Sequence, residues 1–391
     1  MIVRKTLEYR MYNSKRNKHL VNQIDIAGII WNHMIALQRR YYRLTGKYIW
    51  EFRMSHHLLK LRKTQRFSYW KKVGSQAVQQ LAERHHRAYQ RFFNYKAGKT
   101  QLKCGRPGFK KVKKYKSFTL KQSGWKLLGD NKIKIQGHNY KFCLSRPVEG
   151  DIKTVTIKRD NVGRLWVYFS VIQDVTDPVV VSTGKIGGFD FGLKQYLTDS
   201  NGNVYSSPQL FKSEMHNIAK LNRSLSKKKI GSNNCEKARK RLSMAHIKIA
   251  NKRKDFHWKL AYTLAEEFDY LFFEDLNIAG MKKLWGRKVS DLSFSSFLDI
   301  QKQVCQKTGK TFVKIGRWKP TTKPCSRCGV IHELSLSDRT FRCTDCGFVI
   351  DRDYNAAINI CVEGASSTGL GDVRHLFLDA FAVRPQESYP L

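Results

Sequence analysis

The spacing of apolar residues predicts amphipathic helices in the first hundred residues. From Ser14 onward, apolar side chains recur every three or four positions, as they do on the buried face of a helix. That face comprises Leu20, Ile24, Ala27, Trp31, Met34, Leu37 and Tyr41. A second helix is predicted over residues 74–95, capped near Ser75. Its inward positions are Val78, Leu81, Ala88 and Phe92, and its outward positions are Gln76, Gln79 and Gln80.

Alternation of apolar and polar residues predicts strands on either side of these helices. Residues 2–12 have this pattern. Residues 154–172 have it on both sides of Asn161 and Gly163, which predicts a hairpin. One face of that hairpin would carry Leu165, Val167, Phe169 and Val171. Residues 96–118 are rich in Gly, Pro and Lys, so we expect a boundary there.

Three acidic residues accompany predicted elements in the second half of the chain. Segment 185–205 predicts a hairpin that turns at residues 200–202 and holds Asp190 in the middle of its first strand. A short strand over residues 270–273 ends at Glu274 and Asp275. Two helices are predicted between these strands, near 213–229 and 235–267. The later segment "YNAAINICV" is helical in pattern and has Asp353 at its start.

Each acid taken alone has an ordinary structural explanation. Asp190 could cap a turn or bind local amides, Glu274 could belong to an acidic loop, and Asp353 could be a helix N-cap. Taken together, the order of hairpin, helices, strand and acid-bearing helix is that of an RNase H-like fold. In such a fold three carboxylates converge to hold two Mg²⁺ ions across a scissile phosphate.

Four of the nine cysteines form two C-x-x-C pairs, Cys325 with Cys328 and Cys343 with Cys346. Fourteen residues separate the pairs, a spacing that predicts one zinc ion held by four thiolates. A site closed by four cysteines has no position for substrate, so this zinc would be structural. The alternative is four free thiols. The isolated cysteines are predicted to be ordinary small hydrophobic residues: Cys104, Cys143, Cys235, Cys305 and Cys361.

The balance of charged residues indicates which class of partner the protein binds. Lys plus Arg number 73 against 31 Asp plus Glu, a net charge of +42, which favours nucleic acid as the partner. No run approaches the roughly 18 apolar residues of a membrane span, and the first residues lack an apolar signal-peptide core. We therefore expect a cytoplasmic, nucleoid-associated protein with no membrane partner.

Two segments concentrate the positive charge. Residues 96–118 interleave basic residues with Phe109, Tyr115 and Phe118, which suits phosphate contact combined with base stacking. The predicted helix over 235–267 carries a basic face above an apolar stripe, and its lysines repel one another unless a polyanion lies on them. The candidate contacts are Lys110, Lys111, Lys113, Lys114, Arg239, Arg241, Lys248, Lys252 and Arg253. A solvated linker and a solvated helix face are the alternatives.

The order of "GFDFGLK", "FFEDLN", the two cysteine pairs and "DRDYNAAINI" resembles TnpB, the RNA-guided nuclease family of bacterial insertion sequences and relative of type V CRISPR effectors. The resemblance extends from Ile2 to about Val362. It implies a RuvC-like site formed by Asp190, Glu274 and Asp353, with Asp275 and Asp351 as neighbours that bind no metal. The segment "RWKPTTKPC" stands where a Ser-rich lead-in to the cysteines is expected.

The resemblance also implies an α+β multidomain architecture. It comprises a RuvC-like RNase H domain with an inserted zinc ribbon, a β-barrel wedge domain and a helical recognition lobe. The expected boundaries are 1–12 and 101–180 for the wedge domain, 13–100 for the recognition lobe, 181–320 and 351–363 for the nuclease domain, 321–350 for the zinc ribbon, and 364–391 for a disordered tail. In the recognition lobe, Gln79, with Gln76 beside it, is the candidate for reading a short DNA motif, since glutamine can bond adenine edges.

The function expected from the sequence is RNA-guided cleavage of double-stranded DNA next to that motif. One RuvC-like site with two Mg²⁺ ions would cut both strands, and one structural Zn²⁺ would support it. We expect a monomer bound to one guide RNA. Two alternatives stay open: a guided DNA-binding repressor that does not cut, and a resolvase or RNase H that needs no guide.

Overall fold

The computed structural model describes residues 2–129, 131–174, 182–335 and 338–377. The chain divides into two compact units, Met1–Thr176 and Asp177–Leu391. The expected domain boundary at 180/181 therefore lies outside the described residues.

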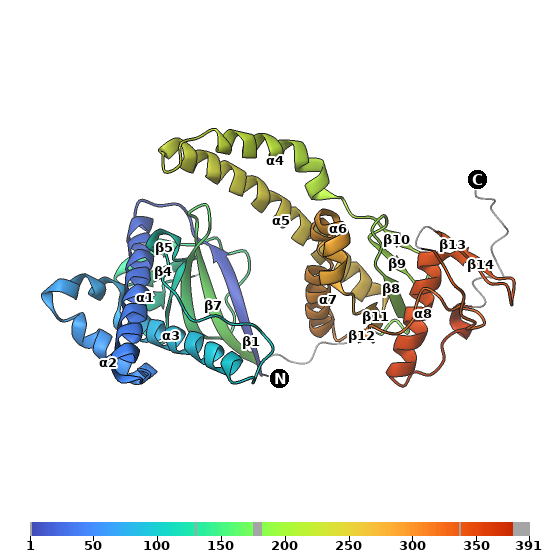
Figure 1. The fold of residues 1–391 in the computed structure, drawn as a ribbon, viewed down its shortest axis with the longest axis horizontal. Helices are drawn as coiled ribbons and strands as arrows, with labels where there is room; N and C mark the ends of the chain where they lie inside the picture. Colours follow the sequence, from blue (N-terminus) through green and yellow to red (C-terminus); the bar gives the residue numbers. More distant parts are fainter. Residues whose placement is uncertain (1, 130, 175–181, 336–337, 378–391) are drawn as a thin grey trace. The chain divides into compact units, whose positions relative to one another are not determined.

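The first unit contains two antiparallel sheets (Figure 1), a larger one with the strand order β1-β7-β6-β2 and a smaller one with the order β3-β4-β5. The strands are β1 (Ile2–Arg10), β2 (Ser117–Leu120), β3 (Trp125–Leu127), β4 (Lys132–Ile135), β5 (His138–Lys141), β6 (Asp151–Arg159) and β7 (Leu165–Asp174). The predicted hairpin is confirmed as β6 and β7, and all four residues expected on one face of β7 are buried. β1 pairs with β7 along its whole length, so the first residues form an edge strand of the larger sheet.

Helices complete the core of this unit. They are α1 (Asn17–Thr45), α2 (Glu51–Leu61) and α3 (Ser75–Lys96), with 3-10 turns η1 (Gln65–Val73) and η2 (Val112–Lys114). The predicted stripe on α1 is buried from Leu20 to Met34, while Leu37 and Tyr41 are partly buried. α1 ends where Gly46 adopts a left-handed conformation, with φ of 64°. Both predicted helices are confirmed.

The second unit is built on a five-stranded sheet with the order β10-β9-β8-β11-β12. Its strands are β8 (Ile186–Asp190), β9 (Leu197–Asp199), β10 (Val204–Tyr205), β11 (Tyr270–Glu274) and β12 (Thr311–Ile315). β8, β11 and β12 run parallel, while β9 and β10 run antiparallel to their neighbours. The adjacent carboxyl ends of β8 and β11 therefore meet at one edge of the sheet.

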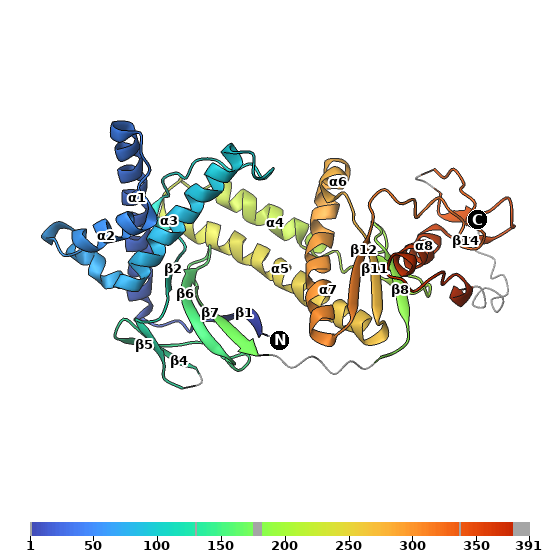
Figure 2. The ribbon, with the colours of Figure 1, turned by 90° about the horizontal axis from the view of Figure 1, so that it is seen from below.

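Helices cover both faces of this sheet. The helices of the unit are α4 (Leu210–Ser226), α5 (Asn233–Glu267), α6 (Ile278–Leu292), α7 (Phe294–Thr308) and α8 (Arg352–Ser367). Figure 2 shows α7 on one side of the strands and α8 on the other. Alternation along β11 explains this, because Leu271 and Phe273 pack with α5 and α7, whereas Phe272 packs with α8. A Cβ at Gly188 would lie 2.2 Å from the carbonyl oxygen of Ala357, so β8 approaches α8 too closely for any other residue.

Between β12 and α8 the chain forms a small cysteine-bearing subdomain with a two-stranded hairpin. Its strands are β13 (Thr340–Arg342) and β14 (Val349–Asp351). The second C-x-x-C pair lies in the turn that joins them. Among the described helices of the whole chain, none combines the length and apolar character required to cross a membrane.

Three expectations about this unit are wrong. Asp190 is the last residue of β8, not its middle, and the turn at residues 200–202 joins β9 to β10 rather than closing a hairpin on β8. The tail expected to be disordered from residue 364 continues as helix to Ser367, and Val373 and Phe377 are buried in the core around α8. These apolar residues have a packing site that the tail's weak pattern did not indicate. Residues 378–391 lie outside the described residues.

Candidate functional site

Three elements bring the predicted acids to one edge of the sheet. Asp190 and Glu274 are the last residues of the adjacent parallel strands β8 and β11, where Phe189 pairs with Phe273. α8 packs against β8 and carries Asp353 in its first turn. All three side chains are partly buried. We call Asp190, Glu274 and Asp353 the acid triad.

The acids of this triad act on one another electrostatically. Burial raises the pKa of Asp190 well above its usual range, and the carboxylates of Glu274 and Asp353 raise it further. Burial also raises the pKa of Glu274. Three converging carboxylates are unfavourable without a cation, and such arrangements are common at metal-dependent active sites.

The acid triad is nevertheless wider than a closed ligand cluster. Among the described residues, the three acids of the triad do not offer one carboxylate oxygen each that all lie within 4.8 Å of one another, as the ligand atoms of a closed site would. Protein groups contact two of its carboxylates instead. The hydroxyl of Thr321 donates a hydrogen bond to Glu274, and the Arg352 guanidinium lies 3.1 Å from Asp353 Oδ1.

The acids next to the triad have other roles. Asp351 is the N-cap of α8, because its carboxylate accepts hydrogen bonds from the backbone N–H groups of Asp353 (2.9 Å) and Tyr354 (3.1 Å). The alternative that Asp353 is the cap is therefore wrong. Asp275 is partly exposed and forms an ion pair with Arg317, with 2.7 Å between the guanidinium and Asp275 Oδ2.

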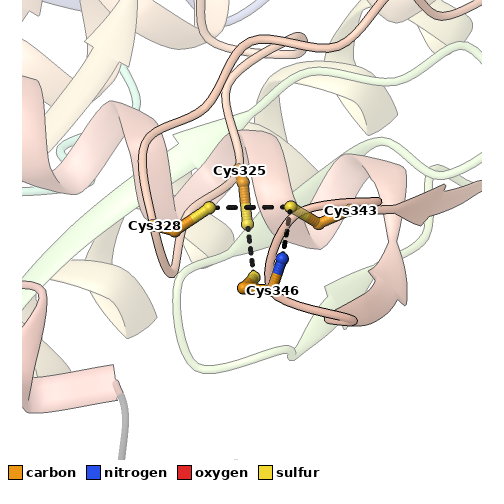
Figure 3. Close-up of side chains that lie close together, drawn as sticks. All are labelled: Cys325, Cys328, Cys343 and Cys346. Atoms are coloured by element: carbon orange, nitrogen blue, oxygen red, sulfur yellow. Dashed lines mark hydrogen bonds between the residues drawn. The ribbon is translucent and has the colours of Figure 1, made fainter.

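The four cysteines of the two pairs converge as the spacing predicts (Figure 3). Their sulfur atoms all lie within 4.8 Å of one another, with 3.7 Å between Cys325 and Cys346 and 3.5 Å between Cys328 and Cys343. Gly329 and Gly347 follow the pairs with φ of +81° and +70°, a conformation that favours glycine. We call these four residues the cysteine cluster. Four thiols this close together are compatible with a structural zinc site.

The thiols of the cluster differ in how readily they ionise. Burial opposes ionisation of Cys343, but hydrogen bonds from the N–H groups of Cys346 and Asp345 and from the thiols of Cys346 and Cys328 together lower its pKa to about 6. Burial instead raises the pKa of Cys325 to about 12 and also raises the pKa of Cys346. His332 also contacts Cys343, with 3.2 Å between its Nε2 and Cys343 Sγ. The cysteine spacing gave no indication of His332, because it lies in the loop between the pairs.

Two asparagines bind the cysteine cluster to α8. Asn355 is fully buried; its Nδ2 donates to the carbonyl of Pro324 (2.8 Å) and its Oδ1 accepts from the N–H of Ser326 (2.9 Å). One turn later, Asn359 Nδ2 donates to the carbonyls of Thr321 (2.8 Å) and Pro324 (2.7 Å). These bonds were not predicted from the sequence. Two asparagines four positions apart in the otherwise apolar stretch 355–362 of α8 were the available signal.

The predicted nucleic-acid contacts have mixed surroundings. Gln76 and Gln79 are partly exposed on α3, whereas Gln80 is buried, so the prediction that it points outward is wrong. In the basic segment 96–118, Tyr115 and Phe118 are buried in the core, and of the three predicted stacking aromatics only Phe109 is exposed. The stacking surface predicted for this segment is therefore largely absent. The amphipathic pattern and the Lys-rich composition did not show that this segment also packs against α1.

Some of the basic candidates already contact other side chains of the same chain. Lys113 is paired with Asp25 at 2.8 Å, and the ammonium of Lys110 lies 4.4 Å from the ring centre of Trp31. On α5, Arg239 is paired with Glu236. The remaining linker lysines and α5 cations are exposed: Lys111, Lys114, Arg241, Lys248 and Lys252.

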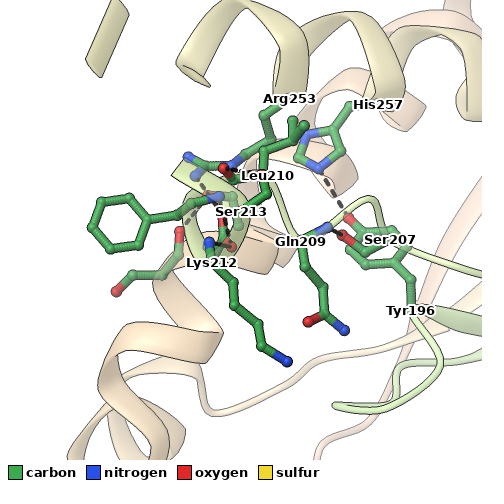
Figure 4. A network of polar contacts seen from close by, with 12 residues as sticks. Tyr196, Ser207, Gln209, Leu210, Lys212, Ser213, Arg253 and His257 are labelled. Atoms are coloured by element: carbon green, nitrogen blue, oxygen red, sulfur yellow. Dashed lines mark hydrogen bonds and ion pairs between the residues drawn. The ribbon is translucent and has the colours of Figure 1, made fainter. Parts of the chain in front are cut away.

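Arg253 belongs to a structural network that joins α5 to the start of α4 (Figure 4). Its guanidinium lies 2.8 Å from Asp291 of α6, whose carboxylate also accepts from the N–H groups of Phe211 and Lys212 at the start of α4. Beside it, the Tyr196 hydroxyl lies 3.1 Å from His257 Nε2. Asp291 thus caps α4 from outside the helix, and Arg253 balances its charge.

Comparisons with known proteins match the segments that hold these sites. The family described as "Probable transposase" (OrfB_IS605) matches residues 169–284, which contain Asp190 and Glu274. The family described as "Cas12f1-like, TNB domain" matches residues 294–360, which contain the cysteine cluster and Asp353.

Curated relatives and one solved structure extend the match. A protein of Streptomyces pristinaespiralis named "Putative RNA-guided DNA endonuclease" is 28% identical over 376 residues, covering 95% of this chain and 92% of the relative. The "TnpB-like protein L79" of Acanthamoeba polyphaga mimivirus is 31% identical over 241 residues, covering 57% of this chain and 46% of that protein. A cryo-EM structure of the Cas12f1–sgRNA–target DNA complex covers 92% of this chain and 99% of its own, with a TM-score of 0.57 and 15% identity, a similarity of fold. The α+β multidomain fold is therefore similar to that of Cas12f1, and the sequence is similar to those of TnpB (OrfB_IS605) proteins.

Proposed function

We propose that this protein is an RNA-guided DNA endonuclease. The observation that carries the proposal is the convergence of Asp190, Glu274 and Asp353 from β8, β11 and α8 at one edge of the sheet. The net charge of +42 supports a nucleic-acid substrate, and the curated relative that spans nearly the whole chain carries this name.

The acid triad would act as the ligand set of an RNase H-like, RuvC-type centre. Its donors are all carboxylate oxygens, the ligands that Mg²⁺ prefers, and a cation would relieve the repulsion that raises the pKa of Asp190. A centre of this type would hold a pair of ions about 3.5–4 Å apart. When bound, two Mg²⁺ ions would supply an activated water and stabilise the leaving oxygen of the phosphodiester.

The elements around the triad would then position it for this chemistry. Asp190 and Glu274 are fixed by the ends of two paired strands, so their separation follows from the sheet. Asp353 is presented by the first turn of α8, whose start is capped by Asp351. Arg352 lies against Asp353 and would have to share or release that carboxylate when cations bind.

The cysteine cluster would hold one structural Zn²⁺. Four converging sulfurs and the lowered pKa of Cys343 fit the ion, because zinc binds thiolates. The residues from 321 to 350 would form the zinc ribbon, and the first unit would provide a wedge domain, formed by its sheets, and a recognition lobe, formed by α1 to α3.

Partners follow from this assignment. The exposed cations of α5 and of the linker would bind the backbone of a guide RNA and its DNA heteroduplex, and Gln76 and Gln79 would approach a short motif beside the target. One chain would bind one RNA. The protein would act in the cytoplasm, on nucleoid DNA.

A retargeting experiment tests the proposal. The protein is purified with its guide RNA, and the guide segment is then replaced by a second sequence. We expect double-strand breaks to move to the DNA site that matches the new guide and to require Mg²⁺. Guided binding without cleavage would favour the repressor alternative, and cleavage that needs no RNA would favour a resolvase or RNase H.

A further inference from the structure

The segment between β12 and the cysteine cluster, residues 316–324, is hydrogen-bonded to both β11 and α8. We call it the bridging segment. At its centre Thr321 is only 5% exposed, and its hydroxyl donates a hydrogen bond to Glu274 Oε1. Packing alone would not require a buried hydroxyl in a connecting loop to be hydrogen-bonded to a candidate metal ligand.

The backbone of this segment is held from the opposite side. The carbonyl of Thr321 accepts from Asn359 of α8, and the carbonyl of Pro324 accepts from both Asn355 and Asn359. Ser326, inside the first cysteine pair, donates its N–H to Asn355. The same few residues therefore connect Glu274, the helix that carries Asp353, and the cysteine cluster.

We propose that Thr321 is a positioning residue for Glu274, and that it couples the fold of the cysteine cluster to the acid triad. Its hydroxyl fixes one oxygen of the Glu274 carboxylate and leaves the other oxygen directed to a cation. Its carbonyl is anchored on α8, so Glu274 and Asp353 keep a fixed relation as long as the cluster is folded. The inference rests on the proposed role of Glu274 as a metal ligand.

Two substitutions at this position separate hydrogen bonding from packing. Thr321→Val keeps the shape of the side chain and removes the hydroxyl, whereas Thr321→Ser keeps the hydroxyl and removes the methyl group. Thr322→Val is the matched control, because it makes the same change one residue later, at a partly exposed side chain. Asn359→Ala tests the anchor, because it removes the donor to the Thr321 carbonyl.

Binding of Mn²⁺ to the full-length protein with its guide RNA provides a readout that does not depend on cleavage. Free Mn²⁺ is followed by electron paramagnetic resonance, and the complex of Glu274→Ala defines the background from RNA. We expect Thr321→Val to weaken the Glu274-dependent binding by roughly 10–100-fold, the usual effect of losing a partner of a metal ligand. The Mg²⁺ concentration for half-maximal cleavage should rise in parallel, while Thr321→Ser and Thr322→Val stay near wild type.

Coupling through the anchor predicts a further result. Asn359→Ala should raise the same Mg²⁺ requirement, and combining it with Thr321→Val should add little, because both changes break one connection. Zinc content and guide RNA binding should be unchanged in Thr321→Val, which shows that the variant is folded.

Three outcomes would overturn the inference. These are unchanged Mn²⁺ binding in Thr321→Val, tighter binding in that variant, or equal losses in Thr321→Ser and Thr321→Val, which would assign the position to packing. Failure of the proposed function would look different, because wild-type protein would then show no guided cleavage and Glu274→Ala would bind Mn²⁺ as wild type does.

Discussion

At the scale of single residues, two of the candidate ligands have an acidic neighbour with different surroundings. Asp351 caps α8 and Asp275 pairs with Arg317, whereas Asp353 and Glu274 belong to the acid triad. We expect Asp353→Ala and Glu274→Ala to lower guided cleavage at least about a hundredfold. Asp275→Ala should have little effect, and Asp351→Ala should cost only the roughly 0.5–2 kcal/mol of a helix cap. Cleavage rates and melting temperatures of the four variants test this, and a larger loss in Asp351→Ala than in Asp353→Ala would reverse the assignment.

The raised pKa of Asp190 predicts how stability depends on pH. Because its pKa in the folded state lies above the unfolded value, the folded protein binds more protons in the window between them, and the free energy of unfolding falls as pH rises through it. Above that window the buried charge opposes folding. We therefore expect Asp190→Asn to melt at a higher temperature than wild type at pH 8 without Mg²⁺, and the difference to shrink on acidification. Thermal melts of the guide RNA complex across pH test this, and a difference that grows toward acid pH would contradict it.

The residues of the site were predictable to different degrees. The acid triad and the cysteine cluster follow from motifs, because each ligand stands beside a recognisable strand, helix or pair in the chain. Thr321 and Asn359 could not be found in this way, since their bonds join residues 47 and 38 positions apart and depend on how the bridging segment lies. The catalytic roles of the triad stay a prediction.

At the scale of elements, hydrophobic periodicity predicted α1, α3 and the β6–β7 hairpin, because each of these elements packs one apolar face against the core. It misplaced Asp190 within β8 and the turn after it, because β9 and β10 are only three and two residues long and carry almost no pattern. It also missed the burial of Tyr115 and Phe118, since a basic and Gly-rich composition obscures two apolar contacts.

Loss of the cysteine cluster should affect mainly the structure close to it. We expect Cys343→Ser to release zinc and loosen the bridging segment, which is bound to α8 by Asn355 and Asn359. Cleavage should therefore fall more than guide RNA binding does. Metal content, cleavage and RNA affinity are compared with those of Cys235→Ser, the same change at an isolated cysteine in α5. Equal losses of cleavage and RNA binding would show that the cluster is a primary RNA contact.

At the scale of the whole molecule, the net charge of +42 favours a permanently bound polyanion that neutralises it. We expect the purified protein to retain a discrete structured RNA of order 100 nucleotides, held by contacts that weaken steeply with salt. Sequencing of the copurified RNA and its release between low and high salt test this. A preparation that is soluble, free of RNA and active on DNA would contradict a guided mechanism.

The most direct test of the central claim is strand-resolved cleavage of a guide-matched DNA duplex by wild type and by Asp190→Ala, each bound to the same RNA. With one acid triad for two strands, wild type should cut both strands, and Asp190→Ala should lose both cuts together while still binding the matched duplex. Loss of one cut alone would require a second nuclease site, and normal cleavage by Asp190→Ala would remove the acid triad from the mechanism.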